Sequence, residues 1–164
     1  MFVDLMKLSD IAREYGYSFD NLKRYNEMFG ETLPEFLEAN EKENKDSIRV
    51  NNLKISRNEL YNRLTEKGFV LTNVNDYGFI VEESNFSISS TEENLLGYFY
   101  IQGVSEMCVS PILLPNQNDF VVDMCAAPGG KATHLSAIMN NKGLVYAFDI
   151  NKRRLSALKN NISR

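Results

Sequence analysis

Apolar side chains recur at helical spacing through residues 1–47. One run covers 5–15 and a second covers 18–30, and each is closed by a glycine. Spacings of three and four residues place such side chains on one face of a helix. Thr32 and Glu35 have the spacing of a capping box, in which each side chain bonds the backbone N–H of the other residue. The pattern therefore predicts three helices in this segment.

After residue 47 the pattern changes to short runs that are typical of strands. Residues 48–55 are rich in branched side chains, but their alternation slips at Asn51, which predicts a bulge or bend within one strand. Runs over 69–74 and 79–81 flank a turn-forming segment and predict a hairpin. A further run over 98–102 predicts another strand.

Three serines in the same region stand where helix caps are expected. Ser56 precedes Glu59 by three residues, which is the spacing of a capping box, and Ser90 has the same relation to Glu93. Ser105 precedes an apolar run. We therefore predict a helix after each of these serines.

The last third of the chain has the pattern of a strand, a tight loop, a helix and a second strand. Residues 120–122 are apolar and predict a buried strand, and 144–148 predict another. Between them, a glycine-rich loop over 123–130 leads into a helix over 131–141 that ends ahead of Gly143. A strand–helix–strand unit of this kind pairs its strands in parallel.

These patterns predict a chain of the α/β class with three parts. The first is a helical N-terminal segment, 1–47, which ends in the polar and charged run 40–47. The second, 48–110, is a small α+β module. The third, 111–164, is the first half of a Rossmann-like fold, because one strand–helix–strand unit and a following helix cannot complete a doubly wound sheet.

The glycine-rich loop is suited to a nucleotide-like ligand. Ala126 and Ala127 are too small to block a ligand, and Gly129 and Gly130 let the backbone approach one closely. Free N–H groups at the start of the next helix favour a negatively charged group. Asp149 follows the second strand, where a carboxylate accepts hydrogen bonds from ribose hydroxyls in dinucleotide-binding folds.

Three ligand classes compete for this loop. A Walker phosphate loop needs glycine where Cys125 stands and a hydroxyl residue where Ala132 stands, so its magnesium ligand is missing. A dinucleotide fingerprint needs Gly-x-Gly-x-x-Gly, from which Ala127 and Ala132 depart. The S-adenosylmethionine (SAM) loop of a methyltransferase tolerates a small residue at Ala127 and keeps the acidic residue after the second strand.

Two strings resemble motifs I and II of the Nop/Sun (Sun/Fmu) family of SAM-dependent RNA cytosine-C5 methyltransferases: DMCAAPGGKATHL over 123–135 and VYAFDINKRRL over 145–155. Two earlier strings, RVNNLK over 49–54 and GYFYIQ over 97–102, resemble the family's RVNxLK element and the segment before its catalytic domain. The resemblance is to the N-terminal portion of an archaeal-type member acting on tRNA. It implies a small module related to RNA-recognition domains, packed on the first half of a class I methyltransferase fold.

The resemblance also implies the residues of a cofactor site. The loop would hold the methionine end of SAM, Asp149 would hold the ribose hydroxyls, and Arg154 matches a position that contacts the cofactor in the family. The implied cofactor-binding residues are Cys125, Ala126, Ala127, Pro128, Gly129, Gly130, Lys131, Asp149 and Arg154. In the family, a cysteine thiolate adds to C6 of cytosine, which makes C5 nucleophilic toward the methyl group of SAM.

That nucleophilic cysteine is expected beyond Arg164, in motifs that these residues lack. We expect Cys125 to be a small packing residue, Cys108 to lie in an apolar core, and His134 to be structural. The chain alone would be inactive and would need the C-terminal half of the methyltransferase domain, in cis or in trans. The acidic residues expected near adenine are absent too, so SAM binding would be weak.

Composition and charge restrict the partners. The chain has 164 residues and a formal net charge of −4, so a surface for RNA must be a local basic cluster. The best cluster consists of Lys152, Arg153, Arg154, Lys159 and Arg164, although a solvated helix face explains it as well. Without an apolar run of membrane-spanning length, a signal-peptide pattern or metal-ligand spacing, we expect a cytoplasmic protein with no metal. The expected partner is RNA, with tRNA favoured over rRNA.

Two functions of other classes fit the same residues. One is a non-catalytic RNA-binding module that carries a relic half of a methyltransferase. The other is a fragment of a nucleotide-dependent oxidoreductase. A binding screen that compares SAM with NAD would distinguish the oxidoreductase from the methyltransferase.

Overall fold

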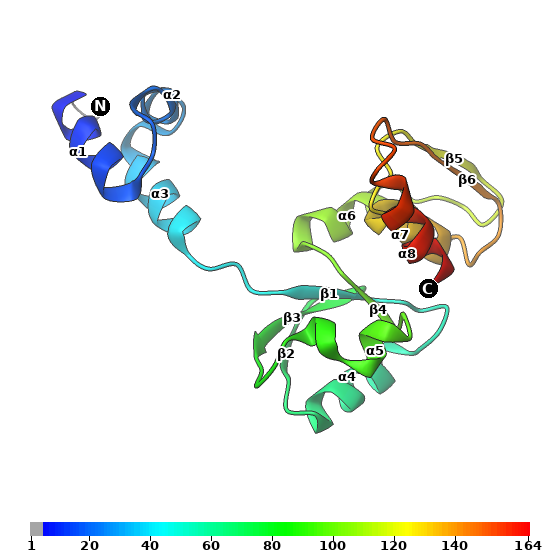
Figure 1. Cartoon of the computed structure of the whole chain (residues 1–164). Helices are drawn as coiled ribbons and strands as arrows, with labels where there is room; N and C mark the ends of the chain where they lie inside the picture. The colour runs from blue at the N-terminus through cyan, green and yellow to red at the C-terminus, as the bar shows by residue number, and fades with distance from the viewer. Residues whose placement is uncertain (1–4) are drawn as a thin grey trace. The chain divides into compact units, whose positions relative to one another are not determined.

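The computed structural model describes residues 5–164 of the chain. The chain divides into two compact units, one reaching to Asn44 and the other formed by Lys45–Arg164 (Figure 1). Each unit has a hydrophobic core of its own. Within residues 5–164, no helix combines the length and the apolar character that crossing a membrane requires.

The first unit is helical, as its apolar spacing predicts. Its elements are α1 (Leu5–Tyr15), α2 (Phe19–Phe29), the 3-10 turn η1 (Gly30–Thr32) and α3 (Leu33–Glu41). The buried core consists of the leucines Leu8, Leu22, Leu33 and Leu37. Phe29 and Phe36 stack beside this core with their ring centroids 4.1 Å apart. The three helices predicted from the sequence are confirmed.

Side-chain caps were predicted for the second and third of these helices, at Ser18 and at Thr32, and only the cap at Ser18 is confirmed. The Ser18 hydroxyl accepts a hydrogen bond from the Asn21 N–H at 3.3 Å and caps α2. The capping box predicted at Thr32 is wrong, because the residues ahead of α3 form a 3-10 turn. The Thr32 hydroxyl is directed back into that turn and donates to the Phe29 carbonyl at 2.9 Å.

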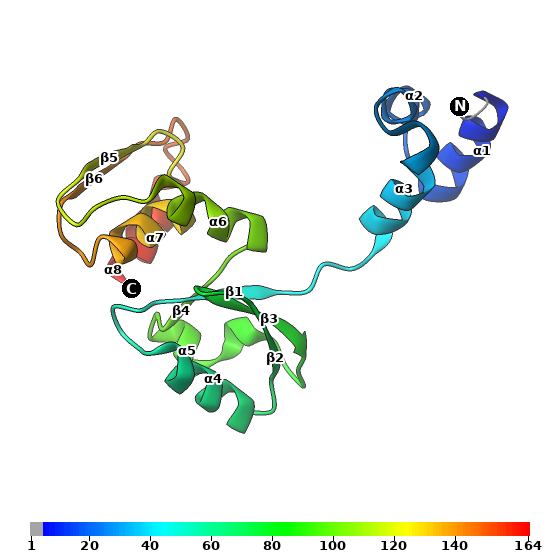
Figure 2. The same ribbon diagram turned by 180° about the vertical axis from the view of Figure 1, so that it is seen from behind.

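The second unit begins with a small α+β module. Its elements are β1 (Ser47–Val50), α4 (Arg57–Glu66), β2 (Val70–Asn75), β3 (Gly78–Glu83), the 3-10 turn η2 (Ile88–Ser90), α5 (Glu92–Leu95) and β4 (Phe99–Ile101). The strands form one antiparallel sheet in the order β2-β3-β1-β4. In Figures 1 and 2, α4 and α5 lie on one side of this sheet and α6 (Val104–Leu113) lies on the other. The central strand β1 is therefore buried along its whole length.

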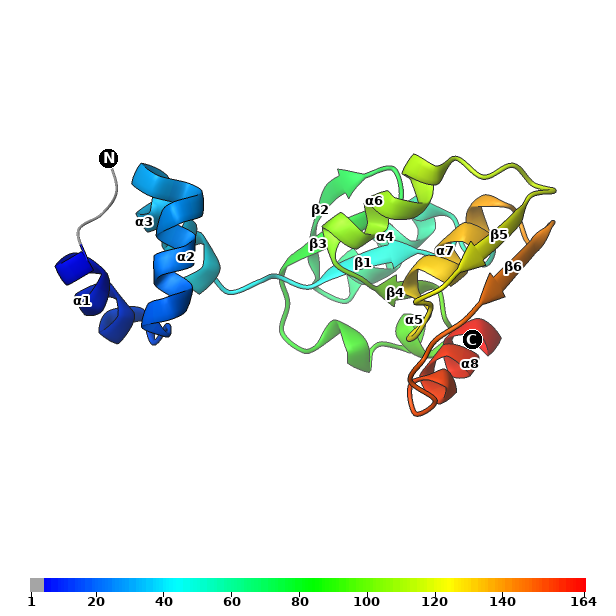
Figure 3. The ribbon, with the colours of Figure 1, turned by 90° about the horizontal axis from the view of Figure 1, so that it is seen from above.

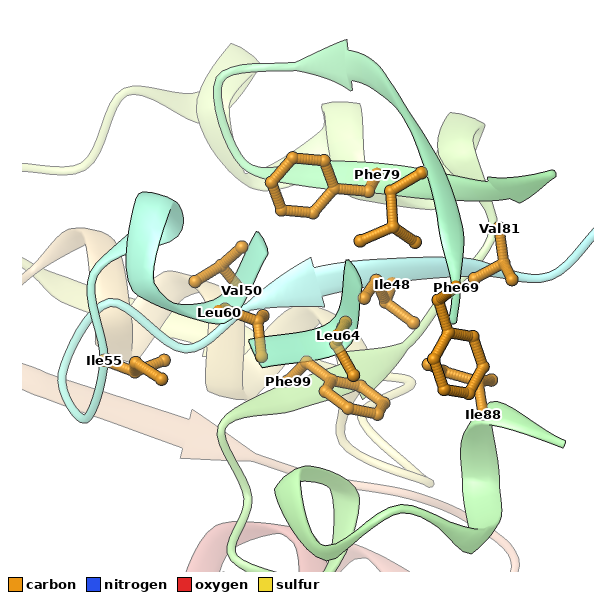
Figure 4. Packing of buried hydrophobic residues seen from close by; sticks show 11 residues of the cluster. Ile48, Val50, Ile55, Leu60, Leu64, Phe69, Phe79, Val81, Ile88 and Phe99 are labelled. Carbon is orange, nitrogen blue, oxygen red and sulfur yellow. The ribbon is translucent and has the colours of Figure 1, made fainter. Parts of the chain in front are cut away.

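The core of the module lies between the sheet and α4 (Figure 4). Phe69, Phe79 and Phe99 are its largest side chains, and each is at most 2% exposed. Leu60 and Leu64 reach it from α4, one helical turn apart, as their spacing predicts. Burial of this many apolar side chains supplies the main stabilisation of the module.

The strand predicted over 48–55 is wrong in its length, since β1 ends at Val50. The Asn51 side chain accepts a hydrogen bond from the Leu53 N–H at 3.3 Å and donates to the Gly97 carbonyl at 2.9 Å. These bonds close a turn directly after the strand. The slip in alternation at Asn51 marks the end of the strand and not a bulge within it.

The predicted serine caps differ in outcome. Ser56 caps α4 and accepts from a backbone N–H of its first turn at 3.2 Å. The cap predicted at Ser90 is wrong, because Thr91 holds that position for α5 and accepts from a backbone N–H at 3.2 Å. The cap predicted at Ser105 is wrong as well, since α6 begins one residue after Gly103 and includes Ser105.

The strand–helix–strand prediction for the last third is confirmed (Figure 3). The elements are β5 (Phe120–Asp123), α7 (Gly130–Ile138), β6 (Leu144–Ala147) and α8 (Leu155–Ser163). β5 and β6 pair in parallel, with Val121 opposite Val145. α7 ends at Ile138, short of the predicted 141, because Asn140 and Asn141 adopt positive φ angles that leave the helix.

One face of this two-stranded sheet is open, which corrects the prediction of a buried strand over 120–122. Phe120 is 63% exposed and Val122 is 52% exposed. On the neighbouring strand, Leu144 and Tyr146 are exposed as well. The alternate residues, such as Val145, pack beneath α7 and α8. A period-two alternation thus separates a packed face from an open apolar face.

Candidate cofactor site

The glycine-rich loop lies between the carboxyl end of β5 and the start of α7. Hydrogen bonds tie it to Phe148, the residue that follows β6: the Ala126 N–H donates to the Phe148 carbonyl, and the Phe148 N–H donates to the Asp123 carbonyl, each at 2.8 Å. The Asp123 Oδ1 atom accepts from the Cys125 N–H at 3.1 Å, which turns the chain out of the strand. The ends of the two parallel strands therefore hold the loop in place.

Asp149 lies beside the loop, and its carboxylate accepts hydrogen bonds from the backbone. Its Oδ2 atom accepts from the Ala127 N–H at 3.0 Å, and its Oδ1 atom accepts from the Asn151 N–H at 2.8 Å. The Asn151 N–H is the main reason why the pKa of Asp149 lies below its ordinary value, and the Ala127 N–H and the Arg154 charge lower it further. Asp149 is therefore a stable anion at neutral pH.

Arg154 and Asn161 fix the backbone of the loop from the side of α8. The Arg154 guanidinium donates to the Ala127 carbonyl, and its Nη1 atom lies 3.9 Å from Asp149 Oδ2. The Asn161 side chain donates to the Pro128 carbonyl at 2.9 Å. The structure thus brings Ala127, Asp149 and Arg154 together, as the sequence predicts, whereas the role of Asn161 was missed.

The alanines and glycines of the loop have a packing role that was not predicted from the sequence. Ala126 and Ala127 are buried against Leu158 of α8. Gly129 has a φ of +118°, and a Cβ atom there would lie 3.2 Å from Leu158 Cδ1. A Cβ atom on Gly130 would lie 3.1 Å from Gln102 Nε2. Small residues are required here because other parts of the protein approach the loop closely.

Arg49 on β1 has a role that was not predicted from the sequence. This side chain is buried, yet it reaches α7 and the end of β4. Its Nη1 atom donates to the Gln102 side-chain oxygen at 2.6 Å and to the Gly130 carbonyl, and its Nη2 atom donates to the Thr133 hydroxyl at 2.9 Å. The only sequence signal for this residue is its place in the RVNNLK string.

The cysteines and the histidine have no arrangement for catalysis within residues 5–164. Cys125 and Cys108 are both free and exposed, which corrects the expectation that Cys125 packs in the loop and Cys108 in a core. His134 is buried, and burial lowers its pKa to about 3, so its imidazole is neutral. Its ring contacts Tyr77 edge-on, with centroids 4.9 Å apart. The structural role expected for His134 stays a prediction.

Asp123 and Lys131, at the two ends of the loop, carry opposite charges, as do the ammonium and carboxylate groups of an amino acid. The Asp123 Oδ2 atom is buried and has no hydrogen-bond partner within residues 5–164. Lys131, at the start of α7, makes no ion pair within the same residues. Met124 is 77% exposed, so the outer side of the loop is open. These donors and acceptors fit the charged amino-acid end of SAM.

A separate cavity of about 470 Å³ lies within the second unit. Its walls include Arg49, Tyr100, Thr133 and Val145. None of the predicted cofactor residues lines it, so the cavity and the candidate site are distinct places. Within residues 5–164 there is no cluster of side chains suited to hold a metal ion.

Two family models match most of the chain. Residues 110–164 match the model described as 16S rRNA methyltransferase RsmB/F. Residues 19–104 match the model described as the N-terminal domain of 16S rRNA methyltransferase RsmF.

Individual relatives agree with these matches. The chain is 35% identical over 168 residues to the 26S rRNA (cytosine-C(5))-methyltransferase nsun-1 of Caenorhabditis elegans, covering 99% of this chain and 25% of that protein. It is 38% identical over 167 residues to the 25S rRNA (cytosine-C(5))-methyltransferase nop2 of Schizosaccharomyces pombe, covering 99% of this chain and 27% of that protein. The chain thus spans about a quarter of the length of these relatives.

A solved structure has the same fold. It is a methyltransferase homolog protein from Pyrococcus horikoshii, which is 40% identical to this chain with a TM-score of 0.87. The similarity covers 96% of this chain and 52% of that one.

Proposed function

Because the chain belongs to the Nop/Sun family of RNA cytosine-C5 methyltransferases, whose RsmB/F and RsmF models it matches, we propose that it is part of a SAM-dependent enzyme of this kind. In this proposal the glycine-rich loop, Asp149 and Arg154 form the first half of the cofactor site. SAM, when bound, supplies the methyl group that is transferred to RNA.

The observation that carries the proposal is the hydrogen bond from the Ala127 N–H to the Asp149 carboxylate. It joins the loop after β5 to the acidic residue after β6, at adjacent ends of parallel strands, where nucleotides bind in open α/β sheets. Each Asp149 oxygen accepts one backbone N–H and retains a lone pair for a ribose hydroxyl. The amino-acid end of SAM would lie at Asp123 and Lys131, which suit its ammonium and carboxylate groups.

Calorimetric titration of the chain with SAM tests this site. We expect weak but measurable binding that drops by about tenfold or more in Asp149→Ala, since the lost interactions involve a charged group. Asp119→Ala is the matched control, because Asp119 caps a turn at the opposite end of β5 and accepts from the Asn116 N–H. Binding that is equal in both variants, or binding of NAD in preference to SAM, would exclude the proposed site.

For the RNA substrate, we infer ribosomal RNA in preference to the tRNA that the sequence favoured. The relatives from C. elegans and S. pombe are ribosomal RNA methyltransferases by name, and both cover nearly all of this chain. A competition assay between tRNA and rRNA fragments, read by filter binding at several salt concentrations, distinguishes the two. Preferential retention of tRNA would contradict this inference.

We also propose that methyl transfer needs residues outside this chain. Within residues 5–164, neither cysteine thiol has a hydrogen bond to a basic side chain, and the face of β5 and β6 that carries Phe120 and Tyr146 is open. A complete class I fold would cover that face and supply the nucleophile, in cis or in trans. The purified chain alone should therefore transfer no methyl group from radiolabelled SAM to RNA. Transfer by the chain alone would refute this.

A further inference from the structure

Arg49 is a buried cation that has no carboxylate partner within residues 5–164. Burial lowers its pKa to about 10, so it still carries its charge at neutral pH. Removing a charge from water is costly unless hydrogen bonds replace those to water. The bonds that do so here come from three neutral acceptors, and two of them belong to α7.

The two acceptors on α7 lie directly after the glycine-rich loop. Arg49 donates to the Gly130 carbonyl and to the Thr133 hydroxyl, and that hydroxyl donates in turn to the Gly129 carbonyl at 2.7 Å. One guanidinium therefore fixes the orientation of the peptide groups at Gly129 and Gly130. These are the peptide groups that lead the loop into the N-terminus of α7.

On the side of the module, Arg49 is itself held in a single geometry. It lies on β1, which is paired on both sides, and its Cζ atom lies 5.3 Å from the centre of the Tyr100 ring. The Gln102 side-chain oxygen accepts from its Nη1 atom at 2.6 Å. A planar, forked guanidinium is pre-organised for several acceptors at once, which the ammonium of lysine cannot reproduce.

We propose that Arg49 is a positioning residue for the cofactor, through which the small α+β module fixes the first turn of α7 and the loop that precedes it. The proposal rests on the proposed SAM site and assigns the module a part in cofactor binding, in addition to any contact with RNA. Arg49 itself does not touch the cofactor. Its effect passes through the Gly130 carbonyl and the Thr133 hydroxyl.

Arg57 offers a matched control in the same module. Its Nη2 atom donates to the Asn73 side-chain oxygen at 2.8 Å and to the Gly78 carbonyl at 3.1 Å, and its guanidinium lies 4.6 Å from the centre of the Phe79 ring. Arg49 and Arg57 thus have the same kinds of partner. The partners of Arg57 belong to β2 and β3, and none belongs to α7.

The test compares Arg49→Lys, Arg57→Lys and Thr133→Val in the full chain. The first readout is amide hydrogen exchange at Thr133, whose N–H donates to the Gly129 carbonyl at 2.9 Å. Met139, which directly follows α7 and whose N–H donates to the Leu135 carbonyl at 2.9 Å, is the internal reference at the other end of this helix. The second readout is the dissociation constant for SAM.

We expect Arg49→Lys to speed exchange at Thr133 by about tenfold while exchange at Met139 stays unchanged, since lost charge-assisted bonds loosen only the first turn. SAM affinity should fall by about tenfold as well. Thr133→Val should lower SAM affinity as well. The variant that carries both Arg49→Lys and Thr133→Val should lose less SAM affinity than the sum of the two single losses in free energy. Arg57→Lys should change neither readout.

Equal exchange at Thr133 in Arg49→Lys and Arg57→Lys would overturn the proposal, as would additive losses of SAM affinity in the double variant. Faster exchange at both Thr133 and Met139 would also overturn it, because Arg49 would then stabilise the fold in general. If no variant and no wild-type chain binds SAM, the proposed cofactor site fails. The exchange readout then decides separately whether Arg49 fixes this turn.

Discussion

At the scale of single residues, the glycine-rich loop shows how one sequence feature serves two purposes. Glycine is required at position 129 because its φ is +118° and because Leu158 approaches it closely. Two residues earlier in the same loop, the Ala127 N–H donates to the Asp149 carboxylate. Close approach of a ligand and close packing of Leu158 both require glycine at this position. A substitution that disturbs packing lowers the free energy of unfolding even in the absence of a ligand, whereas one that disturbs only the ligand site does not.

Gly129→Ala should lower the free energy of unfolding of the second unit by about 1–3 kcal/mol, because a left-handed residue with a Cβ atom is strained and the neighbour is close. Urea unfolding followed by circular dichroism measures this. Gly103→Ala is the control, since Gly103 has a φ of −60° and the nearest atom to its added Cβ is 3.9 Å away. Equal effects of both substitutions would show that strain at Gly129 is absent.

Asp149 should make stability depend on pH in the acid range. Its pKa is lowered by the Asn151 N–H, the Ala127 N–H and Arg154, so its contribution is present above the unfolded pKa of about 4. That contribution is lost as the pH falls through the lower pKa of the folded state. The difference in unfolding free energy between wild type and Asp149→Asn should therefore shrink between neutral pH and about pH 3. A difference that is constant with pH would contradict this.

How much of the site was predictable depended on the sequence distance between partners. Ala127, Asp149 and Arg154 lie within one strand–helix–strand unit, whose geometry follows from its apolar pattern. Arg49, by contrast, donates to acceptors 81 and 84 positions away along the chain. Only the packing of the module on α7 brings these groups together, and no local pattern encodes it.

At the scale of helices and strands, the existence of the elements was predicted well and their first residues less well. Ser18 and Ser56 cap their helices because each is followed directly by helical residues. Ser90 does not, because residues 88–90 form a 3-10 turn and Thr91 is the residue between this turn and α5. Neighbouring hydroxyl residues compete for the same cap, and the spacing to a glutamate does not decide between them.

Thr91→Ala should therefore lower the free energy of unfolding of the second unit by about 1 kcal/mol, the usual effect of losing an N-cap. The Thr91 oxygen accepts from the Asn94 N–H at 3.2 Å, and its hydroxyl donates to the Ile88 carbonyl at 2.8 Å. Ser90→Ala, one residue earlier, should change this energy by less than about 0.5 kcal/mol. Chemical denaturation of both variants checks the assignment, which fails if Ser90→Ala has the larger effect.

At the scale of the whole molecule, the sequence pattern predicted which parts are helical and which are mixed α and β, but not which apolar faces are exposed. The run over 120–122 is apolar enough for a strand buried on both faces, yet only one face is packed. An apolar run predicts burial somewhere, and the partner that provides it is a matter of tertiary structure. Phe120, Val122 and Tyr146 thus form an exposed apolar surface on one face of the sheet, which is suited to packing against a further layer of secondary structure.

The separate cores of the two units predict that they unfold independently. Leu37 is 1% exposed in the core of the first unit, and Leu64 is fully buried in that of the second. Truncating either leucine to alanine should cost about 2–5 kcal/mol of unfolding free energy.

A helical unit of this size has little stability to lose, so Leu37→Ala should unfold the first unit and leave the amide NMR signals of β1 to β6 in place. Leu64→Ala should spare the signals of α1 to α3 in the same way. If either substitution removed the signals of both units together, the cores would be coupled and the chain would be one cooperative domain.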